Sequence, residues 1–490
     1  MSHQTRADTI DQTHFGSVYI GGKWTAPSTD RMINVVSPIT EQIICSVAEA
    51  APEDADRAVK AAHEAFAGGP WPRMTPIERA EILQKFAAIM RTRSQDFATA
   101  WIETTGVITS MAAGSLEYAV SAVDRSIDQA KTFEFVEQHP PEGSGNMLVH
   151  EPVGVVAAIA PWNAPLASMM TKIGPALVAG CTVVMKPAPQ TPVEAYLIAQ
   201  CADEAGFPDG VINLIVADRD ASDHLVRHPL VDKVSFTGSV ATGQRIAAVC
   251  ADRIARVTLE LGGKSAAIVL DDYDLKTAAD SLAGAITVLN GQNCAALTRV
   301  IVSRDRHDEF VAYLTTAIES VTIGNPYDPD TQLGPITLKS QLEKIEGYIE
   351  KGVAEGATLA AGGKRPAHLD IGYYFEPTVF ANVDNHMAIA QEEIFGPVLC
   401  VIPCDDEEDA IRIANDSPYG LAGAVYTNDN AKAFEVARRV RAGTFGQNGM
   451  KASFAISFGG FKQSGLGREG GLVGLRPYLE PKTVMLDGPV

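Results

Sequence analysis

Short continuous apolar runs alternate with helical patterns between residues 151 and 261. The runs VGVVAAIA, CTVVMK, VINLIV, KVSF and RVTLEL are typical of buried strands, and the segments between them carry apolar residues at three- and four-residue spacing. Strands that are apolar throughout are covered on both faces, as in parallel sheets flanked by helices. The pattern predicts a doubly wound parallel sheet, which binds ligands at the carboxyl ends of its strands.

The regions on either side of this unit have other patterns. Residues 1–52 are rich in strand and turn signals, and the chain from residue 52 to about 135 is helical. A second alternating section, from about residue 264 to 460, predicts another sheet with helices. Two segments fit neither unit, namely FVEQHPPEGSGNMLVHEP and the C-terminal PKTVMLDGPV. Their strand-forming residues predict a β arm, whose exposed edges would pair with a neighbouring subunit.

Composition narrows the class of protein. The chain has 490 residues, of which 46% are hydrophobic, so it can bury a large core without disulfides. Its net charge of −20 argues against nucleic acid as the main partner. The longest apolar stretches are far shorter than the roughly 18 residues of a membrane span, and the N-terminus has no apolar signal core. Seven cysteines without regular spacing indicate a reducing compartment. We expect a soluble, cytoplasmic protein with no membrane partner.

Three short motifs resemble binding sites but lack the context that such sites need. GLGREG, residues 465–470, matches GxGxxG, but no strand precedes it and only 20 residues follow it. GGKS lacks the first glycine of a Walker A loop. His224 and His228 are four residues apart on a predicted helix, but no third ligand is evident, so an exposed helix face is favoured and no metal is expected.

Cys294, in LNGQNCAALTR, is either a buried structural thiol or a nucleophile. Most cytosolic cysteines are small core residues. Here Asn290-Gly291 ends a helical segment, which leaves Cys294 on a loop beside the polar Gln292 and Asn293. A thiolate is a strong nucleophile where its surroundings favour the charged form.

Two further polar residues are candidates for chemistry. Glu260 lies on the opposite strand face from Leu259 and Leu261, just before two glycines. A carboxylate near apolar walls has a raised pKa and suits general-base work, although a salt-bridged glutamate at a strand end is an equal alternative. Asn163, in APWNAP, could donate a hydrogen bond to a developing oxyanion or could cap a helix.

Six motifs occur in a fixed order: APWNAP, KPAPQTP, FTGSVATG, LELGGKS, GQNCAALTR and EEIFGPV. Together they resemble the aldehyde dehydrogenase superfamily from about Tyr19 to Leu486, which is essentially the whole chain. The resemblance implies an α/β fold with two doubly wound parallel-sheet domains, one a Rossmann-like cofactor domain and one catalytic, and a small β oligomerisation arm in a homodimer or homotetramer. The expected ranges are 1–130 and 150–262 for the cofactor-binding domain, 263–461 for the catalytic domain, and 131–149 with 478–490 for the arm.

The same resemblance implies a catalytic role for each candidate. Cys294 resembles the nucleophile that attacks the aldehyde carbon to form a thiohemiacetal, and Asn163 with the Cys294 backbone N–H resembles the oxyanion hole. Hydride transfer to the nicotinamide then leaves a thioester. Glu260 resembles the base that activates water for hydrolysis of this thioester. Lys172 and Glu469 match polar positions thought to assist proton movement.

An NAD(P) site is also implied. The matching residues are Lys186 for the adenosine ribose, Gly238, Ser239 and Gly243 at a helix start near the pyrophosphate, Trp162 in the same cleft, Glu393 for the nicotinamide ribose hydroxyls and Phe395 against that ribose. Pro189 stands where NAD-preferring members often carry Glu, so nothing there repels a 2′-phosphate. Asp218 falls in the neighbouring loop, where many members have Gly, and its charge disfavours a phosphate. We expect NAD, with NADP as the alternative.

The substrate tunnel departs from the pattern of members that prefer small aldehydes, which line it with aromatic residues. A single aromatic is left at the matched positions, which hold Ala164, Ser168, Thr171, Val288, Asn293, Met450, Ala452 and Phe458. We therefore expect a wide tunnel and a bulky or medium-chain apolar aldehyde.

Three rival functions are distinguishable by sequence. Relatives that pass the acyl group to coenzyme A typically lack the Glu260 equivalent, and non-catalytic relatives tend to lose the Cys294 equivalent. A cysteine hydrolase would need a Cys–His pair, and no histidine lies near Cys294 in the sequence.

Overall fold

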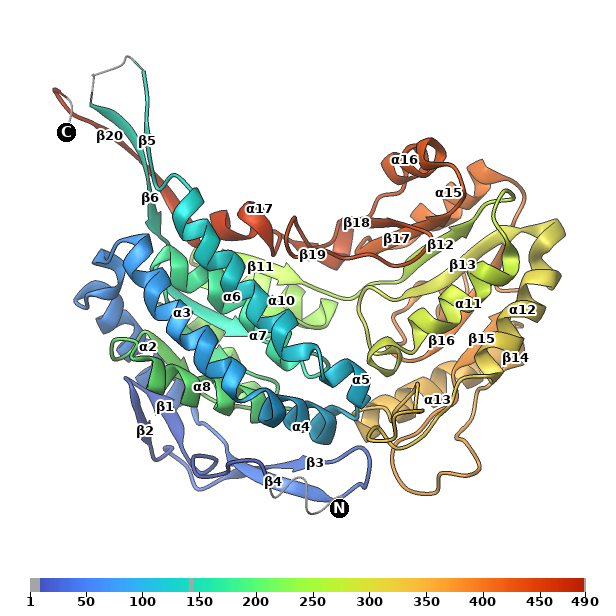
Figure 1. Ribbon diagram of the computed structural model, residues 1–490, viewed down its shortest axis with the longest axis horizontal. Coiled ribbons are helices and arrows are strands. Elements are labelled where there is room, and N and C mark those ends of the chain that lie inside the picture. Colours follow the sequence, from blue (N-terminus) through green and yellow to red (C-terminus); the bar gives the residue numbers. More distant parts are fainter. Residues whose placement is uncertain (1–8, 141–144, 489–490) are drawn as a thin grey trace.

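The computed structural model describes residues 9–140 and 145–488. The predicted ranges 1–130, 131–149 and 478–490 extend in part beyond these described residues. Figure 1 shows two lobes, each a sheet covered by helices, and a narrow arm that projects from the first lobe. The fold is α/β with two mostly parallel sheets, as the sequence predicted.

The first lobe contains an eight-stranded sheet in the order β19–β11–β10–β7–β8–β9–β1–β2. Its five central strands are parallel: β7 (Val155–Ile159), β8 (Thr182–Lys186), β9 (Ile212–Leu214), β10 (Lys233–Thr237) and β11 (Arg256–Glu260). Its edges are antiparallel, and they consist of β1 (Val18–Ile20), β2 (Lys23–Thr25) and β19 (Gly465–Leu466).

Helices cover both faces of this sheet because its central strands are apolar on both sides. Val155 and Ala157 pack into one core and Val156 and Ala158 into the other. One face carries α2 (Pro52–Ala67), α9 (Arg219–Arg227) and α10 (Val240–Ala251). The other carries α3 (Pro76–Thr92), α4 (Ser94–Thr105), α6 (Ser115–Thr132), α7 (Pro165–Ala179) and α8 (Val193–Ala205).

The strand order reverses between β7 and β10. From β7 the chain runs outward through β8 and β9, and it then returns to the other side of β7 to form β10 and β11. The loops that follow the carboxyl ends of β7 and β10 therefore diverge and open a crevice, which is the usual position of a ligand site in such sheets.

The second lobe contains a seven-stranded sheet in the order β14–β15–β16–β13–β12–β17–β18. Its strands are β12 (Ser265–Val269), β13 (Leu297–Ser303), β14 (Thr358–Ala361), β15 (Thr378–Ala381), β16 (Val398–Cys404), β17 (Ala422–Tyr426) and β18 (Thr444–Gln447), and only β14 is antiparallel. One face is covered by α11 (Leu275–Ile286) and α12 (His307–Glu319). The other is covered by α13 (Lys339–Ala354), α14 (Ala388–Gln391), α15 (Glu407–Asn415) and α16 (Asn430–Arg439).

Shorter elements complete the fold. A separate hairpin pairs β3 (Met32–Val36) with β4 (Ile43–Ala48), and two short helices are α5 (Thr109–Ala112) and α17 (Gly471–Leu475). Single 3₁₀ turns occur at Trp71–Arg73, Val288–Gly291, Arg304–Arg306, Lys462–Ser464 and Arg476–Tyr478.

The arm is a three-stranded antiparallel sheet in the order β20–β6–β5, with β5 at Val136–Gln138, β6 at Asn146–Pro152 and β20 at Leu479–Met485. Both segments that the sequence predicted to be strands are therefore paired here. The buried Tyr478 anchors the base of the arm under the first sheet. Its hydroxyl donates to Ser235 Oγ at 3.1 Å, and the Lys233 ammonium lies 4.8 Å from its ring centroid.

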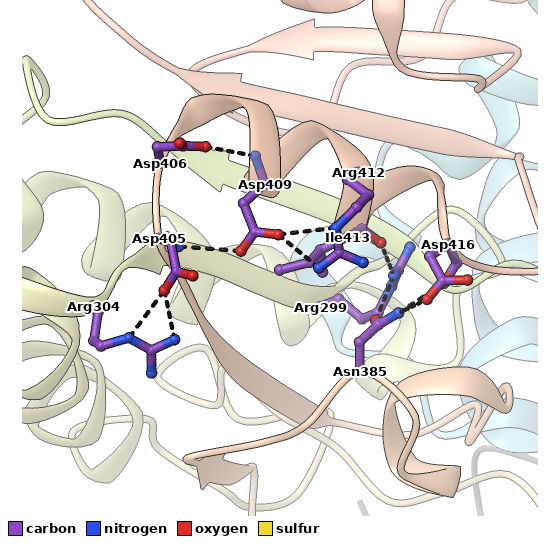
Figure 2. Close-up of polar contacts among 9 residues, drawn as sticks. All are labelled: Arg299, Arg304, Asn385, Asp405, Asp406, Asp409, Arg412, Ile413 and Asp416. Atoms are coloured by element: carbon purple, nitrogen blue, oxygen red, sulfur yellow. Dashed lines mark hydrogen bonds and ion pairs between the residues drawn. The ribbon is translucent and has the colours of Figure 1, made fainter.

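One buried arginine ties the second sheet to the segment that enters it. Arg299 of β13 donates from Nε to the Lys264 carbonyl at 3.0 Å and from Nη1 to Asn385 Oδ1 at 2.9 Å. The same guanidinium donates to the Ile413 carbonyl at the end of α15 at 2.8 Å, as Figure 2 shows, and to the neighbouring Ala414 carbonyl, also at 2.8 Å. It therefore satisfies carbonyls that a helix terminus leaves without partners.

We expect Arg299→Met to lower the free energy of unfolding by about 3 kcal/mol, because it leaves several buried acceptors unpaired. Arg304→Met is the matched control, since Arg304 and its partner Asp405 are exposed (Figure 2) and such pairs contribute about 0–1 kcal/mol. Urea denaturation followed by circular dichroism measures both. Equal losses in the two variants would contradict this reading of Arg299.

Candidate active site

The two lobes are joined by a crossover of four residues, 261–264, between β11 and β12. A Cβ atom added at Gly262 would overlap the Glu393 carboxylate, and one added at Gly263 would overlap the Cys294 carbonyl. The crossover therefore passes between Cys294 and Glu393 at backbone contact distance, and only glycine fits there.

A cleft of about 860 Å³ opens beside this crossover. It is lined mainly by apolar side chains from both lobes. Of the catalytic and cofactor-binding residues named from the sequence, Gly243 and Lys172 do not line it, and the others do: Trp162, Asn163, Lys186, Gly238, Ser239, Glu260, Cys294, Glu393, Phe395 and Glu469. Gly243 lies inside α10 and packs against Leu261, where a side chain would overlap.

Cys294 follows the turn at Val288–Gly291 and precedes β13, so it lies at the amino end of the second sheet. Two buried side-chain amides hold its loop. Asn290 donates to the Gly106 and Pro335 carbonyls at 3.0 and 2.9 Å. Gln292 accepts from the Thr337 N–H at 3.0 Å. These bonds reach out to other segments, so the loop is fixed before any ligand binds.

The surroundings of the Cys294 thiol favour its neutral form. Burial, followed by the charges of Glu393 and Glu260, raises the pKa of Cys294 to about 12. Its own N–H and that of Ala295 oppose this rise by donating toward the sulfur. At neutral pH the thiol is therefore protonated and needs a base before it can attack.

Glu260 is the last residue of β11 and is buried. Among the described residues, neither of its carboxylate oxygens has a hydrogen-bond partner. Burial and the nearby charge of Glu469 raise the pKa of Glu260 well above its ordinary value, against the opposing charges of Lys172 and Arg468. An unpaired carboxylate with a raised pKa has the character of a general base.

A buried ion pair adjoins this carboxylate. Lys172 Nζ lies 2.5 Å from Glu469 Oε1 and donates to Thr237 Oγ1 at 2.6 Å. Thr171 Oγ1 donates to the other Glu469 oxygen at 3.1 Å. Lys172 and Thr171 belong to α7, Thr237 belongs to β10, and Glu469 lies in the segment after β19. These contacts therefore hold the segment after β19 against the first sheet.

Asn163 links the loop after β7 to the Cys294 loop. Its Nδ2 donates to the Gln292 carbonyl at 2.8 Å, and its own carbonyl accepts from Trp101 Nε1 at 3.2 Å. A side-chain amide has two N–H groups. One is engaged with Gln292, and the second is available to a ligand oxygen in the cleft.

One end of the cleft has the features of a dinucleotide site. Burial lowers the pKa of Lys186 to about 8, and the charge of Asp218 counteracts this effect. Ser239 begins α10, where it caps the helix by accepting from the Thr242 N–H at 3.3 Å. A helix N-terminus attracts phosphate, and a buried lysine can reach ribose hydroxyls.

Two aromatic rings and a carboxylate continue this end of the cleft. Trp162 and Phe395 are 5.2 Å apart between ring centroids and nearly perpendicular. Glu393 Oε1 accepts from the Gly263 N–H at 3.1 Å, and burial raises the pKa of Glu393. Its second oxygen can accept from a hydroxyl. The residues present therefore fit a nicotinamide dinucleotide.

The other end of the cleft is richer in aromatic residues than the sequence predicted. Besides Phe458, the side chains of Trp101, Tyr118 and Phe454 line it. Phe454 stacks on Phe458 with centroids 4.6 Å apart, and Tyr118 meets Phe454 edge to face at 6.2 Å. Phe458 is the single aromatic residue at the matched positions, and the three further rings come from positions outside that set. Trp101 and Tyr118 lie on α4 and α6, where an aromatic among apolar helix positions is typical of a core residue.

The structure shows where the motifs that lacked the context of a binding site lie in the fold. Gly465 and Leu466 of GLGREG form β19 at the edge of the first sheet. His224 and His228 both contact Asp56, and His228 is buried, so the expectation of an exposed face is wrong for this residue.

Within the described residues, no group of His, Cys, Asp or Glu is placed to hold a metal ion. No helix in the part of the chain that the structure describes is long and apolar enough to cross a membrane.

The fold and the cleft define the class, which is an α/β enzyme with its site between two doubly wound lobes. The family model described as "Aldehyde dehydrogenase family" matches residues 24–484. The chain belongs to the aldehyde dehydrogenase family, whose members are oxidoreductases.

Several known proteins are similar to this chain over nearly its full length. Geranial dehydrogenase of Castellaniella defragrans is 42% identical over 98% of this chain and 100% of its own length. A 3-succinoylsemialdehyde-pyridine dehydrogenase of Pseudomonas sp. is 40% identical over 95% and 98%. The crystal structure of a Mycobacterium tuberculosis aldehyde dehydrogenase complexed with NAD⁺ superposes with a TM-score of 0.94 at 42% identity, covering 96% and 98%. A mutant of aldehyde dehydrogenase C from Pseudomonas syringae, complexed with NAD⁺ and octanal, has a TM-score of 0.94 at 38% identity, covering 98% and 99%.

The raised pKa of Cys294 predicts slow alkylation of the ligand-free protein. The iodoacetamide rate at Cys294 should be low at pH 7 and rise about tenfold per pH unit toward pH 12, because only the thiolate reacts. Peptide mass spectrometry across a pH series measures this rate, with Cys294→Ala as the control for reaction elsewhere. A rate that levels off near pH 8 would show that the thiol is not stabilised in its neutral form.

Proposed function

We propose that the protein oxidises a bulky or medium-chain apolar aldehyde to the carboxylic acid with NAD, through a covalent intermediate on Cys294. The observation that carries this proposal is the convergence of Cys294, Glu260 and Asn163 on one apolar cleft that also has the features of a dinucleotide site. A purified-enzyme screen of aldehydes with NAD and NADP, followed by absorbance of the reduced cofactor, tests it.

The first step is attack of Cys294 on the aldehyde. Glu260 takes the proton from Sγ in its carboxylate form, because burial raises the pKa of its carboxyl group and so makes the carboxylate a stronger base. The sulfur then bonds to the aldehyde carbon, and the carbonyl oxygen becomes an oxyanion. The free N–H of the Asn163 amide and the Cys294 backbone N–H donate to that oxyanion.

Oxidation converts the thiohemiacetal into a thioester. When bound, NAD supplies the hydride acceptor. Collapse of the oxyanion expels hydride from the former aldehyde carbon and leaves an acyl group on Cys294. The side-chain contacts of Asn290 and Gln292 hold the nucleophile loop while this happens.

Hydrolysis completes the reaction. The Lys172–Glu469 pair relays the first proton from Glu260 to solvent water, which restores the carboxylate form of Glu260. Glu260 then takes a proton from a water molecule as the water oxygen attacks the thioester carbon. The acid departs and the sulfur of Cys294 is freed.

NAD is the proposed cofactor, with NADP as the alternative. Lys186 would hold the adenosine ribose, Ser239 and Gly238 the pyrophosphate, and Glu393 the second ribose. The Mycobacterium and Pseudomonas structures, which are complexed with NAD⁺, support this assignment. The carboxylate of Asp218, close enough to Lys186 to affect its pKa, would repel a 2′-phosphate.

An apolar substrate is supported by the lining of the cleft, in which small residues such as Ala164 and Ala452 leave space between the aromatic rings. The relatives include a geranial dehydrogenase and a structure complexed with octanal, both of which concern medium-chain aldehydes. Each buried methylene contributes about 0.8 kcal/mol, so larger aldehydes gain affinity in this space.

We also propose which residue ranges bind the cofactor, which carry the nucleophile and which join subunits. Residues 1–130 and 150–262 would bind the cofactor, 263–461 would carry the nucleophile, and 131–149 with 478–490 would join subunits into a homodimer or homotetramer. Exposed apolar side chains on the arm, Val136 and Met485, support a partner there. The cytoplasmic location stays a prediction, consistent with seven free cysteines.

Glu260→Gln should slow hydrolysis more than acylation, because a water molecule in the cleft can take the thiol proton in place of Glu260, whereas activation of the attacking water needs the carboxylate. We expect a burst of reduced cofactor and then a steady-state rate lowered by a factor of about 10² to 10⁴. Stopped-flow absorbance measures both phases. Cys294→Ala is the control and should show neither. A normal steady-state rate in Glu260→Gln would assign the base to another group.

Ala164→Phe should narrow the cleft. We expect kcat/KM for octanal to fall more than that for acetaldehyde, since a clash affects only a substrate that fills the space. The wild-type enzyme should prefer octanal or benzaldehyde to acetaldehyde. A wild-type preference for acetaldehyde would refute the large-substrate proposal and leave the dehydrogenase activity in place.

The arm predicts an oligomer. Multi-angle light scattering should give a dimer or tetramer mass for the full chain, because an isolated three-stranded arm exposes strand edges. A monomer at micromolar concentration would contradict the assignment of the arm to subunit association.

A further inference from the structure

One stripe of α6 runs along the substrate end of the cleft and continues past it. Ser115 and Tyr118 line the cleft itself. On the same helical face, Ala122, Arg125 and Gln129 line a small adjoining hollow. The hollow has a volume of about 20 Å³ and shares two lining residues with the cleft, Thr171 and Phe454, so the two lie side by side.

Arg125 is a cation without a carboxylate in this hollow. It is half-buried, and burial lowers the pKa of its guanidinium. Among the described residues its side chain forms one hydrogen bond, from Nη1 to Ser121 Oγ at 2.8 Å, and no ion pair. The adjacent Asp124 carboxylate is engaged 2.6 Å from Arg91. A guanidinium has five N–H donors, so most of those of Arg125 are available to a ligand.

Tyr118 connects Arg125 to the reacting sulfur. Burial raises the pKa of Tyr118, and its hydroxyl is close enough to both Arg125 and Cys294 for their charges to affect that pKa. Seven residues of helix separate Tyr118 from Arg125, a rise of about 10 Å along the axis. A substrate bonded to Cys294 that extends past Tyr118 therefore reaches Arg125 only if its chain is of medium length.

We propose that Arg125 binds a carboxylate at the far end of the substrate, so that the preferred aldehydes are medium-chain ω-oxo acids with an apolar middle. This inference rests on the proposed function. The planar guanidinium matches a carboxylate in two parallel hydrogen bonds, which a hydroxyl cannot form. Gln129 adds an amide donor beside it, and Phe454 and Tyr118 enclose the apolar middle of the chain.

Matched substrates isolate the contribution of Arg125. Suberic semialdehyde is octanal with a carboxylate in place of its terminal methyl group, so the two share chain length and reacting carbon. We expect the wild-type enzyme to prefer the semialdehyde in kcat/KM. Arg125→Gln should reduce this preference by roughly tenfold to hundredfold, as expected for loss of a charge-assisted hydrogen-bonded pair. Lys131→Gln is the matched control, because Lys131 is exposed on the same helix and contacts only Asp128, at 3.8 Å.

A binding measurement gives a second readout that needs no turnover. Suberate should protect Cys294 from iodoacetamide better than octanoate does in the wild-type protein, and Arg125→Gln should abolish the difference. Equal use of the two aldehydes by the wild-type enzyme, or equal protection by the two acids, would overturn the proposal while octanal oxidation leaves the dehydrogenase function intact. Failure to oxidise any aldehyde would overturn both.

Discussion

The separation of the two lobes is set by a crossover that has no room for a side chain. Gly262 and Gly263 pass between the Glu393 carboxylate and the Cys294 carbonyl, and the Gly263 N–H bonds to Glu393. The contact of Gly263 with Cys294 is backbone against backbone, so its distance cannot relax by rotamer changes. The position of the thiol relative to the first sheet, the bond from Asn163 to the Cys294 loop, and the width of the cleft all depend on it.

Burial acts in the same sense on four titratable groups of the cleft. It raises the pKa values of Cys294, Glu260 and Glu393 and lowers that of Lys186. Each shift favours the neutral form, so the cleft is least charged before ligands bind. Such a site accepts an apolar chain readily, and in the proposed reaction charge develops in it only when the aldehyde is attacked.

The local sequence was sufficient for most of the fold and for the central residues of the cleft. Apolar runs predicted β7 and β8, and short motifs singled out Cys294 and Glu260, whose roles stay predictions. Features that depend on contacts between distant segments could not be predicted from local sequence patterns. β19 lies in the first sheet because Gly465 pairs with Glu260, and no local pattern encodes that pairing. Trp101 and Tyr118 were missed since helix periodicity does not tell a core face from a cleft wall.

The end of the chain completes the first lobe. β19 supplies the outer edge beside β11, Glu469 supplies the partner of Lys172, and Tyr478 closes the space under Lys233. A ribosome makes these residues after the rest of the first lobe, and domains tend to fold as they emerge. During synthesis, therefore, the first sheet has an open edge and Lys172 lacks its acid, even though most of that lobe has left the ribosome. Until the segment from Gly465 to Tyr478 emerges, the edge of β11 is open and can pair with a strand of another chain.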